Sequence, residues 1–292
     1  MKQIHFIVNP ISGKGKHVIN QELIDRFFPK EAYKVVLHFS AYKKHAIALT
    51  QEAMKQRPDI IVACGGDGTI HEVAAQLVNT DIALGIIPVG SGNGLASNLE
   101  ISKSMDQAME NVKNGLIKHI DVGQINHKYF FSNMGFGIDA TIIENYEKSG
   151  SRKLISYLKA AIQSAKKFEF KNMEMTINGV PKRVKPLLLF ISNSNEMGYS
   201  MTLTPKASLQ DGLLDILMVP KINTLQKFYF GLLVLLKKTD RFAPAEWMQL
   251  PRLEVTISDF QNNAIQLDGE YYLFKENTFV IQVLPSALKV LC

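Results

Sequence analysis

The chain has 292 residues, of which 46% are hydrophobic, and this is enough apolar material for two packed domains. Its net charge of +6 comes from 33 basic and 27 acidic residues that are scattered without a Lys/Arg block, which argues against a nucleic-acid partner. With Cys64 and Cys292 as its two cysteines, the sequence excludes a disulfide framework and fits a reducing cytosol.

Strands and helices alternate in the first part of the chain. The apolar patterns predict strands at 4–8, 35–39, 60–64 and 83–87, and helices at 17–28, 46–54 and 70–78. Repeated β-α-β units with short connections form parallel sheets that helices cover on both faces. Ligands of such sheets bind at the carboxyl ends of the strands, where three Gly-rich stretches of this chain fall.

Beyond residue 120, strands follow strands. They are predicted at 120–125, 129–134, 173–177, 187–192, 213–219, 253–257, 264–267 and 279–283, with helical stretches at 154–168 and 224–238. This pattern is typical of an antiparallel β-sandwich. We therefore expect an α/β domain at 1–124, to which the tail 285–292 returns, and an all-β sandwich domain at 125–284. A cleft between two such domains is the default place for a ligand.

Two of the Gly-rich stretches are compatible with phosphate binding. Residues 9–16, NPISGKGK, offer glycine backbone, a hydroxyl and lysines to an anion, although they match neither the Walker A nor the GxGxxG pattern. Residues 88–96, PVGSGNGLA, place three glycines where a helix is expected to begin. Taken alone, each stretch fits a plain turn as well as a phosphate loop, and Ser91 fits a helix cap.

The third stretch, CGGDGTIHEV at 64–73, places Asp67 among glycines directly after a buried strand. Packing does not call for an acid there, and a DG turn leaves the two preceding glycines unexplained. A carboxylate beside phosphates is unfavourable without a cation or a donor. Asp67 is therefore expected to act through Mg²⁺, through water, or as an acceptor from a substrate hydroxyl. The three stretches together predict a site for a nucleotide triphosphate.

In this order and spacing, the three stretches resemble the nucleotide-binding blocks of the diacylglycerol kinase catalytic superfamily, which includes bacterial soluble diacylglycerol kinases, sphingosine kinases and ceramide kinases. The similarity extends over essentially the whole chain, at 133–140 (NMGFGIDA), 192–193, 204–207, 211–216 (DGLLDI) and 267–270 (LDGE). The resemblance implies a three-layer α/β domain and a β-sandwich domain, with ATP- and Mg²⁺-dependent transfer of the γ-phosphoryl group to a lipid hydroxyl between them.

The same resemblance assigns roles to individual residues. Nucleotide contacts are implied for Asn9, Ser12, Gly13, Ser40, Gly65, Gly66, Asp67, Gly68, Thr69, Glu72 and Ser91. A structural Mg²⁺ beside the DGLLD block is implied for Asp211 with the carbonyls of Ser208 and Leu213. Asp215 either assists this ion or is simply a residue at a strand end.

Two acids compete for the role of catalytic base. Glu270 matches the proton acceptor of the bacterial branch, whereas Asp67 matches an acid to which the sphingosine branch gives that role. We assign Glu270 as the base, Asp67 to organising Mg²⁺ and the triphosphate, and Asp268 as support. From the residues alone, Asp268 and Gly269 indicate a hairpin turn. Asp139 resembles the residue that meets the lipid head group in sphingosine kinases, or it caps a helix.

The stretch 224–238 is apolar in its middle and flanked by lysines. Such a helix is usually part of a core; the alternative is that it lines the acyl-chain entry or touches the bilayer. Its apolar run is far shorter than the roughly 20 residues that cross a membrane, and no targeting segment is recognised. The histidines show no metal-ligand spacing, so no zinc site is expected. We expect a cytoplasmic protein, peripheral at the membrane.

Several alternatives stay open at this point. Ser91 and the segment 197–203 depart from many bacterial diacylglycerol kinases, and residues 90–93 are closer to the sphingosine and ceramide kinase pattern, so the lipid substrate is open. An NAD kinase also carries GGDGT, and a non-catalytic lipid or nucleotide sensor is a third reading. The expected partners are a membrane lipid and a membrane surface, without nucleic acid. The oligomeric state is open, with a homodimer as one alternative.

Overall fold

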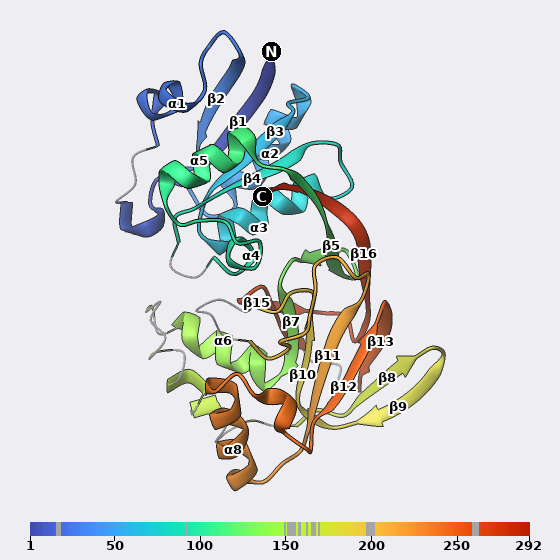
Figure 1. Cartoon of the computed structure of the whole chain (residues 1–292). Coiled ribbons are helices and arrows are strands. Elements are labelled where there is room, and N and C mark those ends of the chain that lie inside the picture. The colour runs from blue at the N-terminus through green and yellow to red at the C-terminus, as the bar shows by residue number, and fades with distance from the viewer. Residues whose placement is uncertain are drawn as a thin grey trace. The chain divides into compact units, whose positions relative to one another are not determined.

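The computed structural model describes the chain except for residues 16–18, 91–92, 149, 151–155, 157–158, 162, 165–167, 169, 197–201 and 259–262, and the side chains of 14–15 (Figure 1). The helix predicted at 154–168 lies largely outside the described residues. The chain divides into two compact units, Met1–Asp121 with Pro285–Cys292, and Val122–Leu284. The sequence analysis placed this division at residues 124 and 125; the strand β5 (Ile117–Ile125) runs through it.

The first unit is built on a parallel sheet. Its strands are β1 (Lys2–Val8), β2 (Tyr33–Phe39), β3 (Ile60–Gly65) and β4 (Ala83–Pro88). They lie in the order β2-β1-β3-β4, and Val290 of the C-terminal strand β16 (Thr278–Leu291) pairs with Leu84 beside β4. Every residue of β3 and β4 is buried, as expected for strands with helices over both faces. The α/β fold predicted for this part of the chain is confirmed.

Helices cover the two faces of this sheet. The elements are the short 3-10 helix Ser12–Gly15, α1 (Gln21–Phe27), α2 (His45–Lys55), α3 (Asp67–Leu77), α4 (Gly94–Asn98) and α5 (Met105–Asn114). Residues of α1 and α5 share a core with one face of the strands, while α2 and α3 contact each other and β1 or β3 (Figure 1). α1 begins four residues later than predicted because Asn20 caps it, its side chain accepting from the Leu23 N–H at 2.9 Å.

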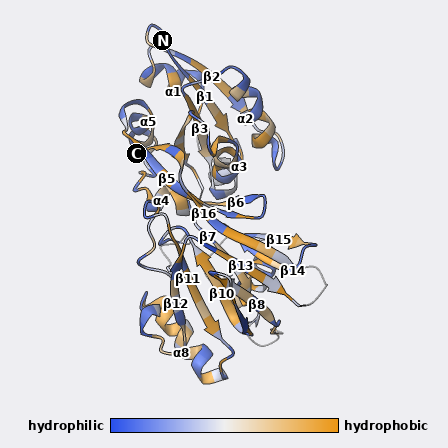
Figure 2. Cartoon of the chain, turned by 90° about the vertical axis from the view of Figure 1, so that its right-hand side faces the viewer, coloured by the Kyte–Doolittle hydropathy of each residue, from blue (hydrophilic) through white to orange (hydrophobic). Residues whose placement is uncertain are grey.

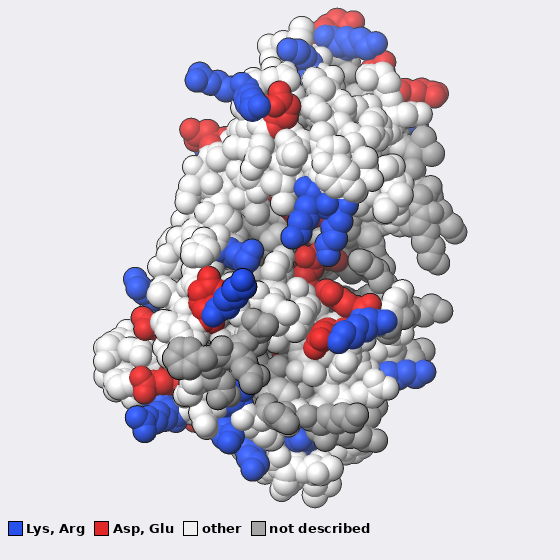
Figure 3. Space-filling model, turned by 180° about the vertical axis from the view of Figure 1, so that it is seen from behind, with Lys and Arg blue, Asp and Glu red and all other residues white. Residues whose placement is uncertain are grey.

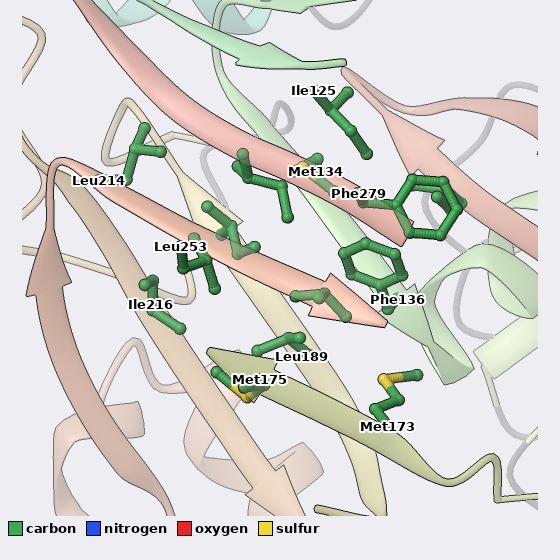
Figure 4. Close-up of a cluster of buried hydrophobic side chains, with 14 of the residues drawn as sticks. Ile125, Met134, Phe136, Met173, Met175, Leu189, Leu214, Ile216, Leu253 and Phe279 are labelled. Atoms are coloured by element: carbon green, nitrogen blue, oxygen red, sulfur yellow. The ribbon is translucent and has the colours of Figure 1, made fainter. Parts of the chain in front are cut away.

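The second unit is an antiparallel sandwich. One sheet has the order β12 (Glu246–Leu250), β11 (Leu214–Pro220), β10 (Pro186–Ser192), β7 (Asn133–Gly137), β14 (Asn263–Leu267), β15 (Glu270–Phe274). The other contains β16, β13 (Arg252–Ile257), β8 (Met173–Ile177) and β9 (Val180–Val184), while β5 pairs with β6 (Lys128–Phe130). Alternate side chains of both sheets meet in one apolar core that includes Phe136, Leu189 and Phe279 (Figure 4), and the core strands are predominantly hydrophobic (Figure 2). The predicted sandwich class is confirmed.

Two predictions in this unit need correction. The single strand expected at 129–134 is two strands, β6 and β7, which are interrupted at Phe131 and Ser132. The backbone N–H groups of Phe131 and Ser132 donate to the carboxylate of Asp268, both at 2.8 Å, and are therefore not available for hydrogen bonds to a neighbouring strand. Directly after β7 the chain forms α6 (Ile138–Lys148), a helix that the strand-rich pattern did not predict. The predicted helix at 224–238 is α8 (Thr224–Leu235), followed by the 3-10 turn Thr239–Arg241.

A pair of histidines lies on β1 and β2. Nδ1 of His5 and Nε2 of His38 are 3.0 Å apart, the rings stack with centroids 5.2 Å apart, and the amide of Gln3 contacts His5 from the other side. The sequence analysis did not anticipate this pair, because parallel pairing of β1 and β2 joins residues far apart in the chain. Burial, His38 and Lys34 lower the pKa of His5 from about 6.5 to about 4.

The His5 environment predicts acid destabilisation of the first unit. Because the pKa is depressed in the folded state, the unfolded chain binds the extra proton first as pH falls, so stability is lost between about pH 6.5 and pH 4. The slope from one such group is at most about 1.4 kcal/mol per pH unit. The free energy of unfolding is measured at several pH values by urea unfolding with far-UV circular dichroism. His5→Gln is expected to reduce the slope of this free energy against pH, whereas substitution of the exposed His127 by Gln is not. Equal slopes in wild type and His5→Gln would contradict the assignment.

Candidate active site

Four loops gather at the carboxyl edge of the first unit's sheet. They follow β1, β2, β3 and β4, and the loop after β3 leads directly into α3. These loops and the start of α3 contain the residues that the resemblance assigned to the nucleotide, except Ser91, which lies outside the described residues. Because the four strands are parallel neighbours, their carboxyl ends share one edge. The structure therefore brings together residues from 9 to 94, as the sequence analysis expected.

The loops after β3 and β4 touch through glycine backbone. A Cβ at Gly90 would lie 2.5 Å from the Cα of Gly66, and a Cβ at Gly65 would lie 2.6 Å from the hydroxyl of Thr69. The Val89 N–H donates to the carbonyl of Gly65 at 2.8 Å. A side chain at Gly90 would force the two loops apart, and one at Gly65 would clash with the first turn of α3, so the glycines let both backbones line the same edge.

Asp67 joins these two loops. It is the first residue of α3, and its carboxylate oxygens accept the backbone N–H groups of Asn93 at 2.8 Å and Gly94 at 2.7 Å. The side chain also stays exposed to solvent. The sequence analysis did not anticipate this bridging contact. Each oxygen of a carboxylate has a second acceptor direction, so the bridge leaves Asp67 able to face a ligand.

The loops after β1 and β2 attach to α3 as well. The Asn9 amide donates to the Thr69 hydroxyl at 3.1 Å, and the Lys44 N–H, four residues after Ser40, donates to the Glu72 carboxylate at 3.1 Å. Gly13 has a φ of +59°, and a Cβ there would lie 2.7 Å from the carbonyl oxygen of Val89. The first turn of α3, whose N–H groups have no partner within the helix, is thus enclosed by neighbouring loops.

In the second unit, Asp268 and Gly269 form the two-residue turn between β14 and β15. Both have positive φ, 48° and 80°, which is the type I′ hairpin that the DG dipeptide indicated. The Asp268 carboxylate accepts N–H groups from Phe131, Ser132 and, at 3.1 Å, Asn133. This turn is therefore tied to the start of β7, and Glu270 is the first residue of β15.

Side-chain hydrogen bonds hold Glu270 and the hairpin turn beside it. The Tyr272 hydroxyl donates to the Glu270 carboxylate at 3.2 Å. The side-chain oxygen of Gln266 accepts from the Gly269 N–H at 2.9 Å, and its amide nitrogen donates to the side-chain Oδ1 of Asn133 at 2.7 Å. Neither Tyr272 nor Gln266 was singled out from the sequence, although a glutamine inside the apolar strand AIQL was a usable signal.

Asp139 lies in the first turn of α6 over Gly135, where a Cβ would clash with its carboxylate at 2.2 Å. It is buried, and its Oδ2 has no hydrogen-bond partner in the part of the chain that the structure describes. Burial raises the pKa of Asp139 to about 7, and a hydrogen bond with Gln266 opposes the rise. The carboxyl group is thus partly protonated near neutral pH and has capacity for one more polar contact.

Comparison with known proteins identifies the family. Residues 3–125 match the diacylglycerol kinase catalytic domain, and residues 132–292 match the YegS C-terminal NAD kinase beta sandwich-like domain. The chain belongs to the diacylglycerol kinase catalytic superfamily. The resemblance inferred from the sequence is confirmed, and with it membership of a superfamily of lipid kinases.

Individual relatives match along most of their length. The diacylglycerol kinase of Bacillus subtilis (strain 168) is 28% identical over 277 residues, which cover 93% of this chain and 90% of the relative. That of Staphylococcus aureus (strain JH9) is 26% identical over 280 residues, covering 92% and 86%. The crystal structure of a diacylglycerol kinase from Bacillus anthracis str. Sterne has the same fold, with a TM-score of 0.78, 20% identity and coverage of 99% of this chain and 96% of that chain.

The metal position that this superfamily implies lies on the turn before β11. The carboxylate of Asp211 is exposed and accepts the Leu213 N–H at 3.1 Å, and Ser208 stands at the start of the turn. Asp215 is buried, and its Oδ2 has no hydrogen-bond partner among the described residues. Burial raises the pKa of Asp215, a hydrogen bond from Gln249 opposes the rise, and the charge of Asp211 adds to it. The exposed carboxylate of Asp211 and the unpartnered Oδ2 of Asp215 are oxygen ligands of the kind that Mg²⁺ takes.

Among the described residues, no three His, Cys, Asp or Glu side chains gather at a metal-binding spacing. An Mg²⁺ site of two carboxylates, backbone carbonyls and water is compatible with this finding.

The described helices include none with the length and hydropathy to cross a membrane.

The Asp67 bridge predicts a loss of stability on amide substitution. In Asp67→Asn one of the two backbone N–H groups faces a donor in place of an acceptor, so the free energy of unfolding is expected to fall by about 1 kcal/mol. Asp106→Asn is the matched control, because Asp106 also lies in a first helical turn and thus shares the helix-dipole effect. Urea unfolding of both variants, measured by circular dichroism, separates the two contributions. Equal losses would mean that the amide contacts contribute nothing measurable.

The Asp139 environment predicts the opposite pH dependence from that of His5. Its pKa is raised in the folded state, so stability is lost as pH rises from about 4 to about 7. Asp139→Asn removes this titration and is expected to gain stability relative to wild type at pH 8 compared with pH 5. The sole tryptophan, Trp247, reports unfolding of this unit by fluorescence. If the free energies of unfolding of Asp139→Asn and wild type differ by the same amount at both pH values, the raised pKa is refuted. Substitution of the exposed Asp240 by Asn is the control.

Proposed function

We propose that the chain transfers the γ-phosphoryl group of ATP to a hydroxyl of diacylglycerol or a closely related lipid. Family membership supports the reaction class, and the diacylglycerol kinases among the relatives favour this lipid. The observation that carries the proposal is the gathering of four loops around the first turn of α3, which presents backbone N–H groups and glycine surface to a polyphosphate. A sphingoid base or a ceramide is a further lipid with a reactive hydroxyl.

In this proposal the first unit holds the nucleotide. Asn9, Ser12 and Gly13 approach from one side and Gly66 to Thr69 from the β3 side, with Ser40, Glu72 and Ser91 completing the set. Asp67 keeps the β4 loop closed through Asn93 and Gly94, and its solvent-exposed carboxylate faces the ligand. Mg²⁺, when bound, neutralises charge on the phosphates and on the leaving ADP. Asp211 with Asp215 and the neighbouring backbone carbonyls would hold a second, structural ion.

Glu270 is proposed as the base. The lipid hydroxyl oxygen forms the new bond to the γ-phosphorus, the bond to ADP breaks, and the hydroxyl proton passes to the Glu270 carboxylate. The Tyr272 hydroxyl, which donates to one Glu270 oxygen, orients the group, and Asp268 holds the hairpin that carries it. Asp139 is proposed to meet the polar head of the lipid, because a head-group hydroxyl would satisfy the buried Oδ2 that has no partner among the described residues.

A substrate panel tests the function. The full chain, radiolabelled ATP and Mg²⁺ are combined with mixed micelles of diacylglycerol, phosphatidylglycerol, sphingosine, ceramide or a polyprenol, and separately with NAD. Label is expected in the diacylglycerol arm above the others. Labelling of NAD alone would show an NAD kinase, and consumption of no substrate would show a non-catalytic sensor; either result overturns the proposal.

Substitution of Glu270 tests the mechanism. Glu270→Gln keeps the shape but removes the proton acceptor, so kcat is expected to fall by about two orders of magnitude or more with an unchanged melting temperature. Glu276→Gln, an exposed glutamate on the loop after β15, is the matched control and is expected to keep wild-type kcat. Near-normal turnover by Glu270→Gln would remove Glu270 from the role of base and leave Asp67 as the remaining candidate.

A further inference from the structure

α8 carries an unusual concentration of exposed apolar side chains. Of the fifteen large hydrophobic residues that are exposed in the described part of the chain, six lie on α8 or directly after it. They are Leu225 at 78%, Phe228 at 75%, Tyr229 at 47%, Leu232 at 44%, Leu235 at 56% and Leu236 at 54% exposed. We call this set the α8 patch. Asn223 and Thr224 before it in the chain and Lys237 after it are exposed and polar.

The α8 patch occupies one side of the helix. At 100° per residue, the spacing of Leu225, Phe228, Leu232 and Leu235 keeps these side chains within about a third of the circumference. Leu233 lies about 100° around the helix from the middle of the patch and is buried with Phe242 in the core under the helix, against which Phe230 and Val234 also pack. The helix is therefore anchored by its inner face, and the outer apolar face needs no rearrangement to become available.

Both ends of α8 are firmly terminated. Asn223 and Gln226 form a reciprocal capping box at the start. At the end, the Lys237 N–H donates to Val234 and the Lys238 N–H to Leu233, which is a Schellman motif. Its left-handed position is held by Lys237, with a φ of +56°, where glycine is the favoured residue. The chain thus carries a lysine side chain, with its positive charge, at a position where the backbone conformation favours a residue without a side chain.

The borders of the α8 patch are basic. Residues 221–241 contain Lys221, Lys227, Lys237, Lys238 and Arg241, against Asp240 as the single acid. The ammonium groups of Lys221 and Lys227 lie over the ring of Phe170. By contrast, basic and acidic side chains are mixed over the face of the molecule that Figure 3 shows. An apolar surface with a positively charged border is complementary to an apolar surface whose own border is negatively charged.

We propose that the α8 patch docks on the surface of an anionic lipid bilayer, with its apolar side chains at the boundary of head groups and acyl chains and its lysines toward lipid phosphates. A second copy of the chain is the competing occupant. Two-fold pairing of α8 with itself would place two basic borders together, which is repulsive, whereas anionic head groups attract them. The inference rests on the proposed function only in that a lipid kinase has to reach a bilayer.

Vesicle sedimentation of the full chain tests the docking without ATP or turnover. We expect binding to vesicles of phosphatidylcholine with one third phosphatidylglycerol, weaker binding to phosphatidylcholine alone, and weakening by salt. Phe228→Glu with Leu232→Glu is expected to lower affinity at least about tenfold. The control pair Leu116→Glu with Val180→Glu adds the same charge at sites that are 77% and 66% exposed. Equal binding by the α8 pair and the control pair overturns the proposal.

Lys237→Gly separates a membrane role from a structural one. Glycine suits the left-handed position, so this variant is expected to melt at a higher temperature than wild type and yet to bind anionic vesicles about fivefold more weakly. Phe228→Trp in a Trp247→Phe background is expected to be quenched by brominated lipid, whereas Leu116→Trp in the same background is not. Unchanged affinity of Lys237→Gly, or equal quenching of the two tryptophans, would contradict docking by α8.

Two further measurements give unambiguous outcomes. If wild type is a dimer without vesicles and the α8 pair of glutamates makes it a monomer, the patch is an interface between copies and the proposal fails. Activity on a short-chain diacylglycerol, dispersed without bilayers, is expected to be equal in wild type and the α8 pair. Wild type that is inactive on every lipid would overturn the proposed function, while the sedimentation result would still judge the α8 patch.

Discussion

The candidate site depends on carboxylates that accept backbone N–H groups from another segment. Asp67 holds the loop after β4 through Asn93 and Gly94, and Asp268 holds the start of β7 through three consecutive N–H groups. Charge-assisted bonds of this kind are stronger than neutral ones and leave no buried donor unsatisfied. Each bridge sets the shape of one loop system. An aspartate thus positions the loops around the first turn of α3 in the first unit, and another positions the Glu270 hairpin in the second.

Among the acids of the two DG motifs, the residues that hold the backbone in place differ from the residue proposed to take part in the reaction. An aspartate that accepts two or three backbone N–H groups would disturb its loop when replaced, so a loss of activity at Asp67 or Asp268 does not by itself identify a base. Glu270 accepts from a side-chain hydroxyl at the start of a strand, and its removal is expected to leave the hairpin in place. The sequence motifs of Asp67 and Asp268 suggest a role in catalysis, but each aspartate also holds a loop in place. The structure shows this second role without any ligand.

Much of the fold and part of the site follow from the sequence, for reasons that differ between the units. β1 to β4 are predictable because buried parallel strands are continuous apolar runs, and their shared carboxyl edge predicts that 9–13 and 65–69 meet. α6 is not, because Ile138 follows a strand without a break and the helix is recognised only from its packing. The His5 and His38 contact depends on strand pairing, and the Asp67 bridge depends on where the β4 loop turns, neither of which local periodicity records.

α8 shows where hydrophobicity stops being informative by itself. Its composition is that of a core helix, yet Leu233 is the one fully buried residue that it contributes among its twelve described positions. The caps, not the burial of its outer face, account for its sharp ends. An apolar surface kept in place by capping has to be matched by a partner or tolerated as a solubility cost. If that partner is an anionic bilayer, each phosphorylated lipid adds the charge that the α8 lysines attract, and residence at the surface would then increase as product accumulates.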